Sequence, residues 1–177
     1  MFMQFHQRIL LGVFAGAMIG GAQAATTTIN MYAVDSDGVS DPIGSIKAEQ
    51  SEYGVVFTPD LKNLDEGPHG FHLHQNPSCE PAKKDGDMAA AVAAGGHYDP
   101  DKAGHHGTPW GEGHLGDLPA LYVNDDGQAV TPVLAPRLEM SDLKGRAVMI
   151  HEGGDNYSDQ PKPLGGGGAR VACGIIK

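Results

Sequence analysis

All but one of the nine histidines of this chain lie between positions 69 and 151, and several occur in patterns typical of metal ligands. The run Gly70-Phe71-His72-Leu73-His74 places two imidazoles at positions i and i+2 of an apolar segment. On a β-strand such residues point to the same face, so the pattern predicts two imidazoles side by side on a sheet. His97 follows two glycines, and His151 ends another apolar segment. Together these four imidazoles indicate a metal site.

The histidines outnumber the ligands that one ion needs, and they suit two. A set of four imidazoles fits Cu(II), which favours tetragonal nitrogen ligation; this set consists of His72, His74, His97 and His151. A second set fits tetrahedral zinc if one imidazole is shared; it consists of His97, His106, His114 and Asp117. An imidazole that loses both ring protons can bridge two cations. Neither cysteine is required as a ligand, which argues against a blue-copper centre.

An all-β domain is expected to position these ligands. Alternating or β-rich segments separated by turns predict eight strands, at 26–34, 43–51, 53–58, 69–75, 118–124, 128–134, 147–151 and 169–176. Eight strands without long helices indicate a sandwich or barrel. Two long loops are expected, at 77–117 with one helical turn at 87–94, and at 152–168. Loops of this length in a compact domain are usually functional.

The first 24 residues resemble a secretory signal peptide. They contain one basic residue, Arg8, then an apolar stretch that is too short to cross a bilayer, then the small residues Ala22-Gln23-Ala24. The alternative is a retained interfacial helix. We therefore expect a signal peptide at 1–24, a single domain at 25–177 and export to the periplasm. Export predicts a disulfide between Cys79 and Cys173, the alternative being two independent buried thiols.

Charge and hydropathy limit the partners. The net charge is -10, and removal of the leader with Arg8 changes it to -11, so nucleic acid is not expected to bind. No other apolar run is long enough for a membrane anchor.

Four separated motifs carry a resemblance to a known family. They are Gly67-Pro68-His69-Gly70-Phe71-His72-Leu73-His74, Gly95-Gly96-His97-Tyr98-Asp99-Pro100, Gly113-His114-Leu115-Gly116-Asp117-Leu118-Pro119, and the closing segment 165–174 with sequence GGGGARVACG. In this order they resemble the Cu,Zn superoxide dismutases, specifically the exported bacterial branch, and the match extends over the whole mature chain. The resemblance implies an eight-stranded Greek-key flattened barrel with two long functional loops.

The resemblance also implies the role of each ligand. Copper would be bound by His72, His74, His97 and His151, and zinc by His97, His106, His114 and Asp117. His105 competes with His106 for the zinc role, but the spacing from His106 to His114 is the one that matches the family. His69 has the wrong strand parity for the copper face and is interpreted as structural.

Two further residues have implied roles beside the metals. Asp155 would accept hydrogen bonds from one copper and one zinc histidine, the alternative being a solvated loop aspartate. Arg170 would guide a small anion to copper, the alternative being an ordinary surface arginine. The lysines Lys83, Lys84 and Lys162 would extend its field or simply aid solubility.

The implied reaction converts superoxide into oxygen and hydrogen peroxide, with His97 acting as ligand and proton store. A copper-delivery protein is disfavoured by Arg170, Asp155 and the complete copper set. A copper-only relative is disfavoured because His106, His114 and Asp117 are all present. A zinc hydrolase is disfavoured because no carboxylate is placed as an obvious base. The protein is expected to be a monomer or a homodimer, with Trp110 and Tyr122 as candidate interface aromatics.

Overall fold

The computed structural model describes residues 24–177, so the expected signal peptide at 1–24 lies outside the described residues except for Ala24. The strands are β1 (Thr26–Asp35), β2 (Gly38–Ser51), β3 (Gly54–Leu61), β4 (Gly67–His69), β5 (Phe71–His74), β6 (Ala82–Lys84), β7 (Asp87–Ala89), β8 (Leu121–Val123), β9 (Val133–Ala135), β10 (Arg146–His151) and β11 (Arg170–Ile176). The helices are short: η1 (Val92–Ala94), α1 (Met140–Leu143) and η2 (Leu164–Gly166). Within residues 24–177 no helix has the length and apolar character needed to cross a membrane.

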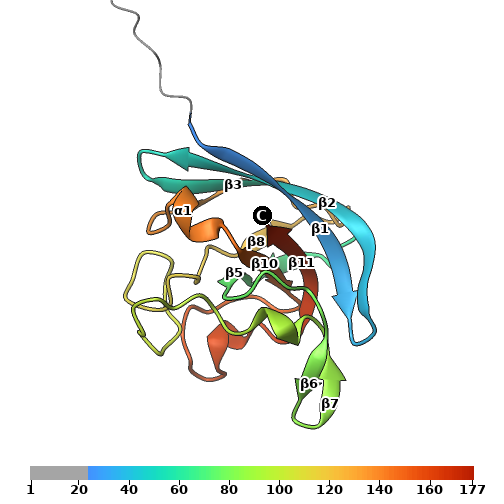
Figure 1. Cartoon of the computed structure of the whole chain (residues 1–177). Helices are drawn as coiled ribbons and strands as arrows, with labels where there is room; N and C mark the ends of the chain where they lie inside the picture. Colours follow the sequence, from blue (N-terminus) through green and yellow to red (C-terminus); the bar gives the residue numbers. More distant parts are fainter. Residues whose placement is uncertain (1–23) are drawn as a thin grey trace, which may run out of the picture.

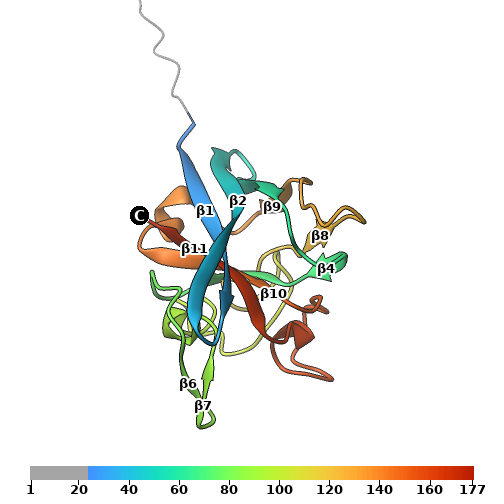
Figure 2. The ribbon, with the colours of Figure 1, turned by 90° about the vertical axis from the view of Figure 1, so that its right-hand side faces the viewer.

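Most of the strands form one curled antiparallel sheet (Figure 1). Its order is β5-β10-β11-β1-β2-β3-β9, and the short strands β4 and β8 form a separate pair. The order departs from the sequence where β10 lies beside β5 and where β9 lies beside β3, which are the crossovers of a Greek-key arrangement. In Figure 2 the long strands β1 and β2, which lie in the middle of this sheet, face the viewer. The expected all-β fold is confirmed.

The core forms because apolar residues alternate along the strands. In β3 the side chains of Val55, Phe57 and Leu61 are buried, whereas Thr58 and Asp60 are exposed. Inside the curled sheet the rings of Phe57 and Phe71 meet edge to face with their centroids 5.3 Å apart. Such an aromatic pair contributes about 0.5 to 1.5 kcal/mol beyond its buried area. Phe71 therefore fixes the strand that carries His72 and His74.

The eight expected strands correspond to strands of the structure, with differences at their ends. The fourth expected strand is divided at Gly70 into β4 and β5, and the sixth, expected at 128–134, is the shorter β9 at Val133–Ala135. The helical turn expected at 87–94 is wrong in its first half, because residues 87–89 form strand β7 instead. The reason is the tight turn at Asp85 and Gly86, whose φ values are 56° and 101° and which pairs β7 with β6 as a hairpin. This hairpin projects from the rest of the fold (Figures 1 and 2).

Candidate metal centre

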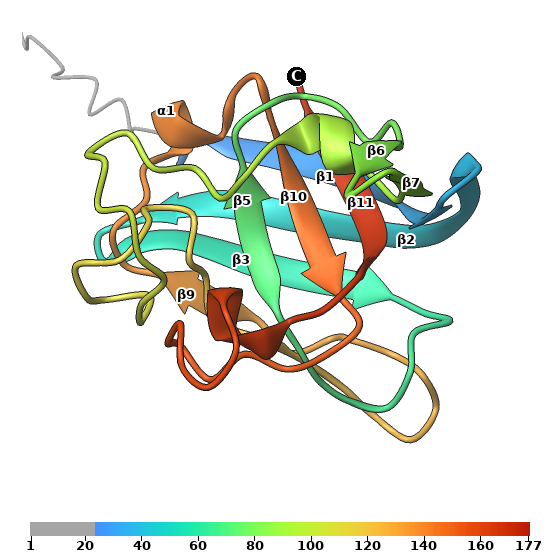
Figure 3. The ribbon, with the colours of Figure 1, turned by 90° about the horizontal axis from the view of Figure 1, so that it is seen from below.

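Two paired strands carry most of the expected copper ligands. β5 pairs with β10 in a register that places Met149 opposite His72, and His151 is the last residue of β10. An isolated bridge between His74 and His97 attaches the long loop to the edge of β5. Figure 3 shows β5, β10 and β11 side by side, with the long loops around them. Residues separated by up to 79 positions therefore meet at one edge of the sheet.

Four buried imidazoles converge there, and we call them the histidine group: His72, His74, His97 and His151. One ring nitrogen of each lies within 4.8 Å of the corresponding nitrogen of the others. Within the described residues four of their ring nitrogens have no hydrogen-bond partner, namely His72 Nδ1, His74 Nε2, His97 Nε2 and His151 Nε2. A buried polar atom without a partner costs about 1 to 3 kcal/mol, and a cation bound by the four lone pairs would remove that cost. The group fits a metal ion that prefers nitrogen ligands.

The second ring nitrogens of these histidines set the tautomers. His74 Nδ1 donates to the carbonyl oxygen of Gly95 at 2.9 Å, and His151 Nδ1 donates to that of Gly168 at 3.3 Å. A carbonyl oxygen can only accept, so both Nδ1 atoms carry the proton and both Nε2 atoms keep a free lone pair. This is the usual arrangement of metal-ligating histidines.

A second set of ligands, which we call the mixed group, lies beside the histidine group: His97, His106, His114 and Asp117. The Nδ1 atoms of its three histidines lie around one oxygen, Asp117 Oδ1, at 2.8, 2.9 and 3.2 Å in chain order. These separations approach the value of about 3.3 Å between ligands of a tetrahedral ion with bonds of about 2.0 Å. His97 belongs to both groups, with Nδ1 facing this one and Nε2 facing the histidine group.

Asp155 connects the two groups. Its Oδ2 lies 2.8 Å from His72 Nε2, and its Oδ1 lies 2.8 Å from His106 Nε2. The side chains of all three residues are fully buried in these contacts. Both histidines thus have their outer nitrogen facing one carboxylate and their Nδ1 facing a metal-binding group.

Burial keeps the histidine group neutral. Desolvation, followed by repulsion from His97, lowers the pKa of His72 and His74 well below the usual value. Desolvation also lowers the pKa of His151 to about 4. Neutral imidazoles bind metals, whereas protonated ones do not, so these rings are prepared as ligands near neutral pH.

The mixed group has the opposite electrostatic character. Burial opposes protonation of His106, but its hydrogen bonds with Asp117 and Asp155 outweigh burial and raise its pKa to about 9. Burial likewise opposes ionisation of Asp117 and Asp155. Their hydrogen bonds with histidines, of which the one with His106 has the largest effect, nevertheless hold the pKa of both carboxyl groups well below the usual range. Two buried carboxylates in the ionised form make this side suitable for a divalent cation.

Arg170 lies beside the histidine group, close enough for its charge to contribute to the lowered pKa of His74 and His151. Its Nη1 donates to the carbonyl oxygen of Ala91 at 2.5 Å and its Nη2 to that of Gly95 at 2.6 Å. The oxygen of Gly95 also accepts from His74 Nδ1, so one peptide group connects the guanidinium to a ligand. The guanidinium borders a cavity of about 360 Å³ whose lining also includes Lys84 and Gly168.

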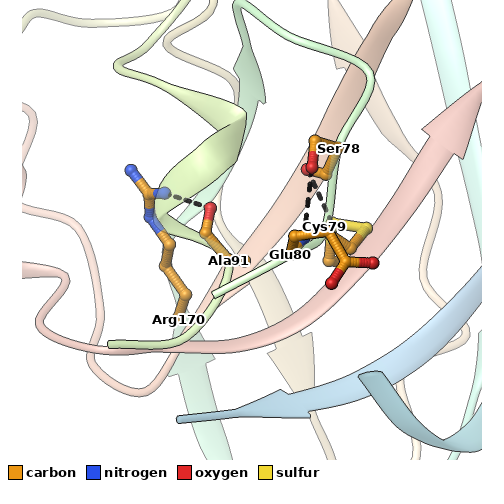
Figure 4. The surroundings of a disulfide bond; sticks show 6 residues. Ser78, Cys79, Glu80, Ala91 and Arg170 are labelled. Atoms are coloured by element: carbon orange, nitrogen blue, oxygen red, sulfur yellow. Dashed lines mark hydrogen bonds between the residues drawn. A yellow bond between two sulfur atoms is a disulfide. The ribbon is translucent and has the colours of Figure 1, made fainter. Parts of the chain in front are cut away.

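The predicted disulfide between Cys79 and Cys173 is confirmed, with a Cα separation of 5.8 Å. It joins the loop that follows β5 to β11, the strand on which Arg170 lies (Figure 4). Figure 4 also shows the hydrogen bond from Arg170 to Ala91. The covalent link therefore joins the loop that contains Ala91 to the strand that carries Arg170.

The remaining histidines of the loops and strands lie outside both groups. His105 is exposed and its Nδ1 donates to the carbonyl oxygen of Ala103 at 3.0 Å. His69 is buried, with its ring nitrogens 2.6 Å from the oxygen of His151 and 2.8 Å from that of Asp65.

Three supporting residues were not found from the sequence. Asp159 accepts the backbone N–H of His106 at 2.9 Å, Gly165 packs against Asp155, and Arg137 donates to three carbonyl groups of the loop 99–117. Asp159 and Arg137 contact segments 23 to 53 residues away, whereas Gly165 and Asp155 belong to one loop. No local pattern signals any of these contacts.

An all-β fold that brings two ligand groups together around one shared imidazole defines a binuclear metalloprotein. The family model described as copper/zinc superoxide dismutase matches residues 43–176. The Cu-Zn superoxide dismutase of Escherichia coli K12 is 54% identical over 172 residues, which cover 97% of this chain and 99% of the relative. That of Pasteurella multocida is 64% identical over 137 residues, or 76% of this chain and 74% of the relative.

Solved structures agree with the sequence comparisons. The Cu/Zn superoxide dismutase of Brucella abortus is 48% identical, with a TM-score of 0.85 over 86% of this chain and 100% of that one. The monomeric copper, zinc enzyme of Salmonella enterica is 56% identical, with a TM-score of 0.78 over the same shares. This chain belongs to the copper/zinc superoxide dismutase family. It is an oxidoreductase that uses copper and zinc to dismute superoxide.

Proposed function

We propose that this chain is a periplasmic enzyme in which the histidine group binds copper and the mixed group binds zinc. The assignment rests on the two ring nitrogens of His97. Its Nε2 faces three further imidazoles, whereas its Nδ1 faces two imidazoles and Asp117. Four nitrogen ligands suit Cu(II), and a set of three nitrogens and one carboxylate suits tetrahedral zinc.

Bound copper and His97 have separate roles in the proposed reaction. Bound copper supplies the one-electron redox chemistry by which one superoxide is oxidised to oxygen and another is reduced to peroxide. Two protons are consumed for each hydrogen peroxide formed. His97 Nε2 is the ring atom able to hold one of them between the two half-reactions, because Nδ1 stays directed at the mixed group. The second proton comes from solvent.

Arg170 attracts the substrate. Superoxide is a small anion, and the whole protein is strongly acidic, with a net charge of -10. The field at the cavity nevertheless depends on the nearest charges, and the guanidinium of Arg170 is fixed there by two hydrogen bonds. A positive group in a cleft raises the local concentration of an anion even when the total charge is unfavourable.

Activity measured together with metal content tests this proposal. The protein is loaded with copper and zinc, both metals are counted by elemental analysis, and superoxide removal is followed by pulse radiolysis. We expect activity only with copper bound, a loss of copper and activity in His151→Ala, and a slower reaction with normal metal content in Arg170→Ala. A wild-type protein that holds both metals and leaves superoxide unchanged would contradict the proposal.

The periplasmic location rests on the leader at residues 1–24 and on the disulfide, which persists in oxidising compartments. Cell fractionation with N-terminal sequencing should find a mature protein that begins at Ala25 in the periplasm. Full-length chain in the cytoplasm would contradict it.

We also propose a monomer, by similarity to the Salmonella enterica enzyme that is described as monomeric. Size-exclusion chromatography with light scattering should give the mass of one chain. A mass of two chains would indicate a homodimer and make the exposed Trp110 and Tyr122 the first contacts to examine.

A further inference from the structure

Arg137 makes an unusual set of contacts with the loop that carries the zinc-side ligands. It lies just after β9, between Asp117 and His151 in sequence but in neither ligand group, and its side chain is partly buried. Its Nε donates to the carbonyl oxygen of Pro109 at 2.9 Å, its Nη1 to that of Gly113 at 3.0 Å and its Nη2 to that of His114 at 2.5 Å. A single guanidinium thus binds three carbonyl groups of one loop.

That loop has no regular secondary structure of its own. Residues 99–117 contain no helix or strand, and the chain doubles back on itself, so that the α-carbon of Gly113 lies against Gly107. One backbone hydrogen bond crosses the doubled segment, from His114 N–H to the oxygen of His105 at 3.2 Å. Two carboxylates also accept backbone N–H groups of this loop, Asp117 from Gly107 and Asp159 from His106, each at 2.9 Å. Without Arg137 the carbonyl groups of residues 109, 113 and 114 would lose a shared charged donor.

Within the described residues the guanidinium of Arg137 hydrogen-bonds only to this loop. Among residues 24–177 no carboxylate lies within ion-pairing distance of Arg137, so its charge is balanced by the dipoles of these carbonyl groups. The planar fork of arginine presents several donors at fixed angles, which the single ammonium of lysine cannot reproduce.

Two of the three contacts lead directly to the mixed group. His114 is itself a member, with Nδ1 3.2 Å from Asp117 Oδ1. Gly113 packs so closely on the same carboxylate that a Cβ there would lie 2.8 Å from Asp117 Oδ2. Fixing the backbone at these two residues fixes the positions from which His114 and Asp117 meet a metal.

We propose that Arg137 is a positioning residue that holds the loop 99–117 in its metal-binding conformation before zinc arrives. The proposal rests on the assignment of the mixed group to zinc. An ordered loop needs no further loss of conformational freedom when zinc binds, so Arg137 raises zinc affinity without touching the ion.

The only tryptophan of the chain provides a local readout. Trp110 follows Pro109, one of the residues bound by Arg137, and 69% of Trp110 is exposed. Time-resolved fluorescence anisotropy therefore reports motion of this loop. In metal-free wild type we expect small local motion of Trp110; in metal-free Arg137→Lys we expect a larger amplitude, which zinc reduces.

Zinc affinity is measured in parallel by competition with a chelator, and Co²⁺ absorption reports the geometry of the mixed group. We expect Arg137→Lys to bind zinc about 10- to 100-fold more weakly, as is typical when a ligand loses its supporting partner. The matched control is Arg146→Lys, because Arg146 also donates to backbone carbonyl groups, those of Asp142 and Gln75, but outside this loop. Its guanidinium also lies 3.5 Å from the centroid of the Tyr98 ring, a cation–π contact that lysine can keep. It should keep normal zinc affinity and normal Trp110 motion. Circular dichroism verifies that both variants are folded.

The outcomes distinguish failure of the proposed function from failure of the role assigned to Arg137. If wild type binds no zinc at the mixed group, the proposed function fails. If wild type binds zinc but Arg137→Lys binds it equally well, or if Trp110 is equally mobile in both metal-free proteins, the role of Arg137 is refuted. An equal loss in Arg146→Lys would also refute it, because the effect would then be one of general stability.

Discussion

Replacing Gly165 by alanine should separate Asp155 from His106 and weaken zinc binding. A Cβ at this position would lie 1.9 Å from Asp155 Oδ1, 2.6 Å from its Cγ and 2.9 Å from His106 Nε2. Ordinary contact begins at 3.4 Å, so the carboxylate would have to move by about 1.5 Å. The 2.8 Å contact between Asp155 Oδ1 and His106 Nε2 cannot survive that movement.

The expected magnitude has three parts, one in zinc affinity and two in stability. Loss of the outer partner of a metal-ligating histidine lowers metal affinity by about 10- to 100-fold, or about 1.4 to 2.7 kcal/mol. The φ angle of Gly165 is +68°, where an alanine costs about 1 to 2 kcal/mol in backbone energy. The broken charged hydrogen bond adds about 1.5 to 3 kcal/mol to the loss of stability of the metal-free protein.

The control variant Gly145→Ala separates the steric clash with Asp155 from the energy cost of placing alanine at a positive φ. Gly145 has a φ of +74°, and a Cβ there would meet no atom within 4 Å. Gly145→Ala should therefore lose only about 1 to 2 kcal/mol of stability, with normal zinc affinity. Urea unfolding and chelator competition on both variants give the comparison. If Gly165→Ala matched Gly145→Ala in both measurements, the reasoning about the Asp155 bridge would be wrong.

Three further predictions concern other parts of the molecule. Replacing Cys79 and Cys173 by serine removes a link across 94 positions and should lower the free energy of unfolding by about 4 to 5 kcal/mol in the chain-entropy model, measured by urea unfolding; a loss under 1 kcal/mol would contradict this. Lys84→Gln should slow superoxide removal at low salt and flatten its dependence on ionic strength, because Lys84 borders the cavity beside Arg170; an unchanged salt dependence would exclude this lysine from substrate attraction. Phe71→Ala should cost about 3 to 5 kcal/mol by leaving a cavity in the core, and a normal midpoint in urea would show that the core adjusts there.

Sequence patterns within one strand or turn were enough to predict the strands and the side-by-side placement of ligands on them. His72 and His74 share a face because strand residues two apart must do so, and both are fully buried on β5. The helical turn expected at 87–94 forms only at Val92–Ala94. The preceding Asp85-Gly86 is a strong hairpin signal, and its preference for positive φ determined the conformation instead.

Contacts between distant segments could not be predicted in the same way. Arg137 lies 23 residues from His114, and Asp159 lies 53 residues from His106, so neither pair forms a motif. Gly165 is one of four consecutive glycines, and only the packed structure shows that it contacts Asp155. Residues that support a site from other segments become visible only when the chain is folded.

We infer that His97 serves two metal-binding groups with its two ring nitrogens. A protein loaded with Cu²⁺ in both groups tests the claim directly by electron paramagnetic resonance. A shared imidazolate should couple the two copper spins, so that the signal of isolated Cu²⁺ is lost at low temperature and returns on replacement of one copper by zinc. Two independent Cu²⁺ signals in the fully loaded protein would contradict the claim.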